Sequence, residues 1–177
     1  PSINAVAKLL IERDLISEDL AIFAAKASQG HIGVARYLAT DKQVRDDRLT
    51  TLKIPLMITD ISSAYKAAQL LVDTAKARAE ADAEVRDSGE IEKLKQAWGS
   101  TGSKLAAGGA KAVKELEKEQ KTRSTRLVRD YLDRALLDLA TLYRDVMLVQ
   151  SGVSESLINS DLKTEITKMA GSITESK

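Results

Sequence analysis

Several residue types are absent or scarce in this chain, and each absence removes a class of structure or chemistry. There is no cysteine, which excludes disulfides, thiolate catalysis and thiolate metal sites. Aromatic residues make up 3% of the 177 residues and only two prolines occur, whereas charged residues reach 30%. Sheets need aromatic and β-branched residues, so this composition favours long, surface-charged helices. We therefore predict an all-α protein.

Net charge and long apolar runs are lacking as well. The formal net charge is +1, so no bulk field favours nucleic acid, a membrane or an acidic partner. No apolar run approaches the roughly 18 residues that a membrane helix needs, and the N-terminus lacks a basic segment followed by an apolar stretch. The sequence predicts a soluble, cytoplasmic protein that does not bind a membrane. Because it begins with Pro1 rather than Met, we expect a fragment or a processed product.

Apolar periodicity divides the chain into a part with short helices and a part with longer, more charged helices. Three short helices are expected over residues 3–13, 18–29 and 32–39, with Ser17 as an N-cap and Gly30 as the left-handed residue that ends the second. Longer, more charged helices follow. They are expected over residues 44–52, from 58 to a stop or bend at Ser88-Gly89, over 90–98, over 127–149 up to Gly152, and over 160–169. Residues 99–110 are predicted to form a loop, and the polar stretch 114–126 to project into solvent.

Candidate motifs for catalysis or ligand binding are weak. GSTGSK lacks the glycine spacing and the strand-to-helix context of a phosphate-binding loop. His31 is the single histidine and has no carboxylate nearby in sequence, and no inward-facing Glu-x-x-His pairs occur that could hold two metals. Neither a catalytic residue, a cofactor nor a metal is predicted. Basic residues from Lys111 to Arg126 are interleaved with glutamates and lack aromatic neighbours, so this line does not predict direct nucleic-acid binding.

Two stretches carry a resemblance to a known family. SQGHIGVARYLATD, at residues 28–41, is similar to the small helical lid of an AAA+ module in bacterial clamp loaders, the subunits of DNA polymerase III that load the sliding clamp. KELEKEQKTRSTRLVRDYLDRALLDLATLYRD, at residues 114–145, resembles the helical collar of the same proteins. The resemblance implies a lid domain at residues 1–41 and a collar, or oligomerisation, domain at residues 42–177.

Three residues of the lid motif are assigned by this resemblance. ATP-binding members of the family carry a phosphate-sensing arginine at the start of the third lid helix, and the matching position here is Gly33, with Arg36 one turn later. We therefore expect that the nucleotide contact is lost and that Gly30, Gly33 and Arg36 are structural. From the residues themselves, Gly30 can supply a positive φ, and Gly33 can permit close approach of the third helix to its neighbour.

The resemblance also implies partners. These are the gamma/tau and delta subunits in a hetero-pentamer, with the sliding clamp and primer-template DNA contacted by the whole complex. The fragment itself is expected to be no enzyme, although its parent belongs to a DNA-directed DNA polymerase holoenzyme. Trp98, Tyr131 and Tyr143 are candidate interface residues, because aromatic side chains often dominate interface energies, although core packing is their simpler role. Two alternatives stay open: the collar of a gamma/tau or related replication ATPase subunit, and a free-standing helical adaptor that begins at Pro1.

Overall fold

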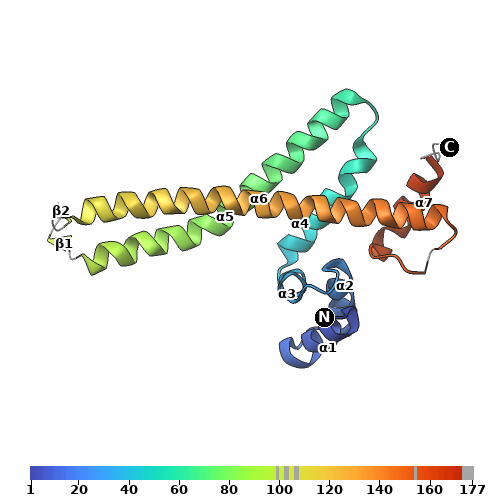
Figure 1. Ribbon diagram of the computed structural model, residues 1–177, viewed down its shortest axis with the longest axis horizontal. Coiled ribbons are helices and arrows are strands. Elements are labelled where there is room, and N and C mark those ends of the chain that lie inside the picture. Colours follow the sequence, from blue (N-terminus) through green and yellow to red (C-terminus); the bar gives the residue numbers. More distant parts are fainter. Residues whose placement is uncertain (99, 102–103, 106–107, 154, 173–177) are drawn as a thin grey trace. The chain divides into compact units, whose positions relative to one another are not determined.

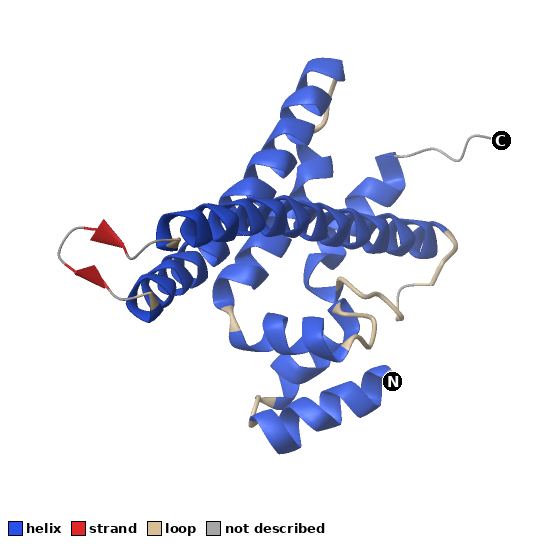
Figure 2. Ribbon diagram, turned by 60° about the vertical axis from the view of Figure 1, so that its left-hand side comes forward, coloured by secondary structure: helices blue, strands red, loops and turns tan. Residues whose placement is uncertain are grey.

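The computed structural model describes residues 1–98, 100–101, 104–105, 108–153 and 155–172, and the fold is all-α, as the composition predicts (Figures 1 and 2). The chain forms two compact units. The first comprises residues 1–67 and 135–177, and the second, which we call the hairpin unit, comprises residues 68–134. The predicted domain boundary at Asp41 stays a prediction.

Three short helices begin the first unit: α1 (Ile3–Asp14), α2 (Glu18–Ala27) and α3 (Ile32–Thr40). Their apolar stripes form one core, in which small side chains dominate. Val6, Leu10 and Leu38 are buried among alanines of α2 and α3. Because alanine allows helix axes to approach closely, this core is thin and needs few large side chains. The three predicted helices are confirmed within one or two residues.

The turn after α2 differs from its prediction. Gln29, with φ of +52°, occupies the left-handed position, and Gly30 follows with φ of +84°. Gln29 N–H donates to the Lys26 carbonyl at 2.9 Å and Gly30 N–H donates to the Ala25 carbonyl at 3.1 Å. This pair of bonds is a Schellman motif whose first left-handed residue is Gln29. The assignment of that position to Gly30 was therefore one residue too late.

A second apolar cluster holds the rest of the first unit together. It combines α4 (Lys42–Lys53), the last turns of α6 (Gly109–Gln150) and the C-terminal helix α7 (Lys163–Ser172), which follows the 3-10 turn η2 (Ser160–Leu162). Leu162, Ile166 and Met169 are buried in it, which confirms the apolar side predicted for the last helix. Asp41 caps α4 by accepting from the backbone N–H groups of Gln43 and Val44. The first unit thus contains two separate small cores.

The long helix α5 (Ile61–Ala97) begins after the 3-10 turn η1 (Ile54–Met57). Its start is fixed by reciprocal bonds: Ser63 N–H donates to Asp60 Oδ1 at 2.7 Å, and Asp60 N–H donates to Ser63 Oγ at 2.9 Å. The hydrogen bonds from Ser63 lower the pKa of Asp60 below its ordinary value. Apolar spacing from Ile61 onward predicts that Ile61 and Tyr65 are buried on the stripe of this helix, but both are exposed.

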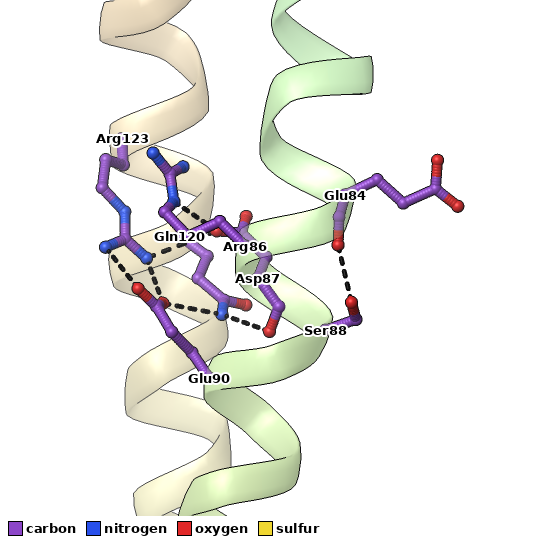
Figure 3. A network of polar contacts seen from close by, with 7 residues as sticks. All are labelled: Glu84, Arg86, Asp87, Ser88, Glu90, Gln120 and Arg123. Carbon is purple, nitrogen blue, oxygen red and sulfur yellow. Dashed lines mark hydrogen bonds and ion pairs between the residues drawn. The ribbon is translucent and has the colours of Figure 1, made fainter.

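The predicted stop or bend at Ser88-Gly89 is wrong, since α5 is continuous through both residues. Gly89 costs a helix interior about 1 kcal/mol relative to alanine. Contacts from the facing helix offset that cost: Gln120 donates to the Asp87 carbonyl, and Arg123 binds the carboxylates of Asp87 and Glu90 (Figure 3). The helix is therefore held on both sides of the glycine by tertiary contacts that periodicity does not reveal.

Helix α6 (Gly109–Gln150) returns antiparallel to α5 through the hairpin unit, and the two are joined by the two-residue strands β1 (Ser100–Thr101) and β2 (Lys104–Leu105). Part of the predicted loop, residues 99, 102–103 and 106–107, lies outside the described residues. The polar stretch 114–126 was expected to project into solvent, but it packs along α5 through Gln120, which is buried, and Arg123. Gly152 ends α6 as predicted, with φ of +80° in a second Schellman motif.

Candidate functional site

Exposed apolar side chains gather in two segments of the first unit, residues 56–65 and 136–153. On α6, Leu136, Tyr143 and Met147 are 56%, 44% and 67% exposed. Spacings of seven and four residues place them on one side of the helix. Contiguous exposed apolar surface of this kind marks an interaction site more often than isolated exposed residues do. This outer face of α6 is the strongest candidate site in the described part of the chain.

A groove of about 470 Å³ adjoins the outer face. Tyr143 forms one wall, and Pro55, Leu56 and Ile58 of the η1 region form another. Met169 of α7 contributes the apolar part of the third wall, and Glu165, Lys168 and Ser172 add polar groups. A mostly apolar lining with one side chain of each charge fits a protein segment better than a small ionic ligand.

Helix α6 can expose an apolar face because its opposite face is buried through different chemistry. Leu142 and Val146 enter the second apolar cluster. Beside them, Asp138, Thr141 and Asp145 are buried polar residues, each at most 4% exposed. One side of this helix segment is therefore buried within the first unit, and the other side is exposed and available to a partner. A helix that is apolar on a second side normally needs a second partner.

A buried polar network fixes this part of α6. Arg48 of α4 donates from Nε to Asp138 Oδ1 at 3.1 Å and from Nη2 to Asn159 Oδ1. Its guanidinium carbon also lies 5.7 Å from the centroid of the Phe23 ring, within range of a cation–π contact. Arg48 thus ties α2, α4, α6 and the segment before η2 to one side chain.

Asn159 and Asp145 complete the network. Asp145, which is fully buried, accepts from the backbone N–H of Asn159 at 2.7 Å, from Asn159 Nδ2 at 2.9 Å and from Arg144 Nη1 at 2.9 Å. Asn159 Nδ2 also donates to Thr141 Oγ1 at 3.2 Å. The buried charges are paired and hydrogen-bonded, which is the condition under which burial is tolerated. The network's role is to hold the chain after α6 in one place.

Sequence reasoning missed this network, and one signal could have revealed part of it. Asp138, Thr141 and Asp145 recur at spacings of three and four among the leucines of α6, so polar residues interrupt an otherwise apolar stripe. Such an interruption indicates buried polar contacts. Their partners, Arg48 and Asn159, lie 90 and 14 residues away from Asp138 and Asp145. No local pattern could have identified them.

The three predicted interface residues have different environments. Tyr143 lies in the groove, half-exposed, and remains a candidate contact residue. Tyr131, in the hairpin unit, donates its hydroxyl to Asp82 on α5, so its polar end is used within the chain. Trp98 is 41% exposed and lies against Gly108. Tyr143 belongs to the first unit, whereas Tyr131 and Trp98 belong to the hairpin unit.

The lid motif residues have structural contacts. Gly30 has a positive φ, and a Cβ there would lie 2.6 Å from the Pro1 carbonyl oxygen. At Gly33 a Cβ would meet only the ring of His31, at 3.4 Å or more, so the expected close approach to a neighbouring helix is wrong. His31 acts as the N-cap of α3, where Nδ1 accepts from Val34 N–H at 3.2 Å. Asp14 accepts two hydrogen bonds from one edge of the Arg36 guanidinium, from Nε and from Nη2.

Comparisons with models of protein families, with curated proteins and with solved structures find no match to this chain. Among the described residues, no helix combines the length and apolar character that crossing a bilayer requires.

Proposed function

We propose that this chain is the lid and collar part of a delta-prime subunit of the bacterial DNA polymerase III clamp loader. Its task is assembly: the collar packs beside gamma/tau and delta subunits in a hetero-pentamer that loads the sliding clamp on primed DNA in the cytoplasm. The chain contributes helix faces rather than a catalytic group. Its parent subunit belongs to the DNA-directed DNA polymerase holoenzyme, and no cofactor is assigned to the part described here.

One observation supports this proposal above the others. The outer face of α6 and the adjoining groove leave Tyr143, Met147 and Leu136 exposed, although the same helix segment is rigidly held by a buried network on its other side. A pre-ordered apolar face loses little conformational entropy when it binds. Such a face is suited to a constitutive neighbour, and a collar subunit in a ring has two neighbours.

The state of Arg36 favours a delta-prime subunit over an ATP-hydrolysing gamma/tau subunit. A phosphate-sensing arginine needs its guanidinium available to the nucleotide. Here the Nε–Nη2 edge of the guanidinium is already hydrogen-bonded to Asp14, at 2.7 and 3.0 Å, so Asp14 competes with a phosphate for that edge. The neighbouring helix-start position holds Gly33, which has no side chain to contribute. This arrangement is consistent with a subunit that holds the ring together without responding to nucleotide.

Native mass spectrometry tests the proposal. The chain is mixed with the matching gamma/tau and delta subunits, with and without ATP, and incorporation into a five-subunit complex without nucleotide is the expected result. Asp substitutions at Tyr143 and Met147 should abolish incorporation, because they place charges on the outer face. Leu15→Asp is the control: Leu15 is 87% exposed at the end of α1 and lies outside that face. A chain that stays monomeric beside competent partners would contradict the assembly role.

A further inference from the structure

A second surface, at the far end of the hairpin unit, carries a concentration of positive charge. Residues 93–114 contain five lysines, no arginine and neither Asp nor Glu, so this stretch has a formal charge of +5 in a chain whose total is +1. The rest of the chain is therefore net negative. Elsewhere on the hairpin, Arg123 is paired with Glu90 and Asp87, and Arg78 is paired with Asp82.

The fold brings the two ends of this stretch together. The β1–β2 pair connects the end of α5 to the start of α6, with Ser100 opposite Leu105 and Thr101 opposite Lys104 (Figure 1). The Trp98 ring lies on Gly108, whose φ is +94°, and a Cβ at that glycine would be 3.3 Å from Trp98 Cζ3. At 1.5 Å per helical residue, the lysines of α5 and α6 lie within roughly 10 Å of this contact along the helix axes.

We propose that this hairpin tip, defined as Lys93, Lys95, Trp98, Lys111 and Lys114, binds single-stranded nucleic acid. The four lysines are exposed, and none of them forms an ion pair within the part of the chain that the structure describes. They are available to neutralise phosphates, and Trp98 offers a partly exposed ring on which an unpaired base can stack. The inference stands on the tip's own residues and does not depend on the proposed assembly role.

The hairpin fold places an aromatic side chain beside the lysines at the start of α6, which the sequence of α6 alone does not provide. Along α6 the basic residues beyond Lys114 alternate with Glu115, Glu117 and Glu119, and no aromatic side chain lies among them. Pairing of the helix ends adds Trp98 and two lysines from α5 to Lys111 and Lys114, where no carboxylate intervenes. The tip therefore combines a charged surface with a stacking platform, the two components of sequence-tolerant single-strand binding.

An anionic membrane is the main competitor for a basic, tryptophan-bearing tip. Interfacial binding needs an apolar face that enters the acyl region. Trp98 is the one large apolar side chain that is exposed in the described part of residues 93–114. A single exposed ring provides too little apolar area for stable membrane binding, whereas it suffices to stack on one base. Nucleic acid is therefore the ligand that these residues favour.

The chain contains one tryptophan, so Trp98 itself reports binding. The full chain is titrated with an unlabelled oligo-dT while tryptophan emission is followed. Stacking should quench the emission, and the apparent affinity should fall steeply with salt. If about four phosphates are neutralised, the single-strand slope predicts a roughly 50-fold loss between 50 and 200 mM salt. A duplex of the same length should bind more weakly and leave the emission nearly unchanged.

Two variants of equal charge locate the site, with a fluorescein-labelled oligo-dT followed by anisotropy. One replaces four tip lysines by Gln, and the other replaces four exposed lysines elsewhere, at positions 53, 66, 76 and 163. The tip variant should lose at least about tenfold in affinity and the control should retain most of it. Trp98→Ala should cost at least about fivefold while leaving helical circular dichroism intact.

Three results would overturn the proposal. The first is no response to the oligonucleotide at low salt. The second is an equal loss of affinity in both lysine variants, which would mean that bulk charge alone is responsible. The third is a blue-shifted Trp98 emission with phosphatidylglycerol vesicles in the absence of any response to the oligonucleotide, which would assign the tip to a membrane. Each result is independent of whether the chain enters a five-subunit complex.

Discussion

Arg36 donates two parallel hydrogen bonds to the carboxylate of Asp14, from Nε to Oδ2 at 2.7 Å and from Nη2 to Oδ1 at 3.0 Å. The pair links the first and third helices of the three-helix core, since Asp14 is the last residue of α1 and Arg36 lies in the middle of α3. Hydrogen bonding to Asp14 raises the pKa of Arg36 above its ordinary value, so the guanidinium stays charged at every accessible pH.

The bidentate geometry of the Arg36–Asp14 pair predicts how variants of the two residues affect stability. Arg36→Met and Asp14→Asn should each lower the urea midpoint of the three-helix core, and the double variant should lose less than the sum of the two. Arg36→Lys should rescue little, because an ammonium group cannot form both parallel bonds. Circular dichroism at 222 nm during urea unfolding gives the four midpoints. Additive losses would show that the two side chains do not interact in solution.

The two glycines that flank His31 should respond oppositely to alanine. Gly30→Ala places a side chain at φ of +84° and a Cβ 2.6 Å from the Pro1 carbonyl oxygen, so it should destabilise the chain by about 1–3 kcal/mol. Gly33→Ala adds a Cβ in ordinary contact with the His31 ring inside α3, and should stabilise by up to about 1 kcal/mol. Thermal unfolding of both variants measures this contrast. Equal effects at the two positions would refute the conformational difference.

The buried network around Arg48 predicts a large penalty for removing one partner. Arg48→Met removes the guanidinium that donates to both Asp138 and Asn159, and should cost about 3–5 kcal/mol in unfolding free energy. Adding Asp138→Leu to that variant should recover part of the loss, since the buried carboxylate that Arg48 paired with is removed as well. Arg129→Met, at an exposed position of α6, is the matched control and should change stability by no more than about 0.5 kcal/mol. A single variant that costs no more than this control would contradict the network's role.

The hairpin unit should show a stability component that depends on Glu90. Hydrogen bonds from Arg123 and Gln120 lower the pKa of Glu90 below its ordinary value of 4.5. A carboxyl group with a lowered folded pKa stabilises the fold above its unfolded pKa, and this contribution is lost as the pH falls through the folded pKa. Glu90→Gln should therefore lower the urea midpoint at pH 7 and have less effect at pH 3.

Trp98 emission follows this transition, because the single tryptophan lies at the end of the same hairpin. Glu84→Gln is the control: the Glu84 side chain extends away from Arg123 and Gln120, and it should leave the midpoint unchanged at both pH values (Figure 3). If Glu90→Gln shifts the midpoint equally at pH 7 and pH 3, the ionised carboxylate is not what stabilises the hairpin.

Local patterns predicted the helices well and their connections less well. Apolar spacing located α1 to α4, α6 and α7 because each buries one stripe. The same reasoning placed a break at Ser88-Gly89, since the residues that carry α5 through the glycine, Gln120 and Arg123, lie more than 30 positions later. Likewise, Gln29 rather than Gly30 is the first residue with a positive φ after α2. The two backbone hydrogen bonds of the Schellman motif, to the Lys26 and Ala25 carbonyls, fix that position.

The candidate sites divide in the same way. Tyr143 could be named in advance because an aromatic residue on a strongly periodic helix is a reasonable anchor, but whether it faced a core or solvent depended on which side of α6 the Arg48 network occupies. Trp98 was named without a partner, and its contact with Gly108 arises only because the end of α5 lies beside the start of α6 in the hairpin.

By itself, the sequence determined an all-α chain of amphipathic helices with no thiol chemistry, because composition and period act through local propensity and burial of one stripe. Tertiary structure decided which helix faces stay exposed to solvent and which charged side chains form ion pairs. Those outcomes depend on residues 14 and 36, 48 and 138, or 98 and 108 coming within a few ångströms, and such distances follow from the packing of whole helices rather than from any stretch read alone.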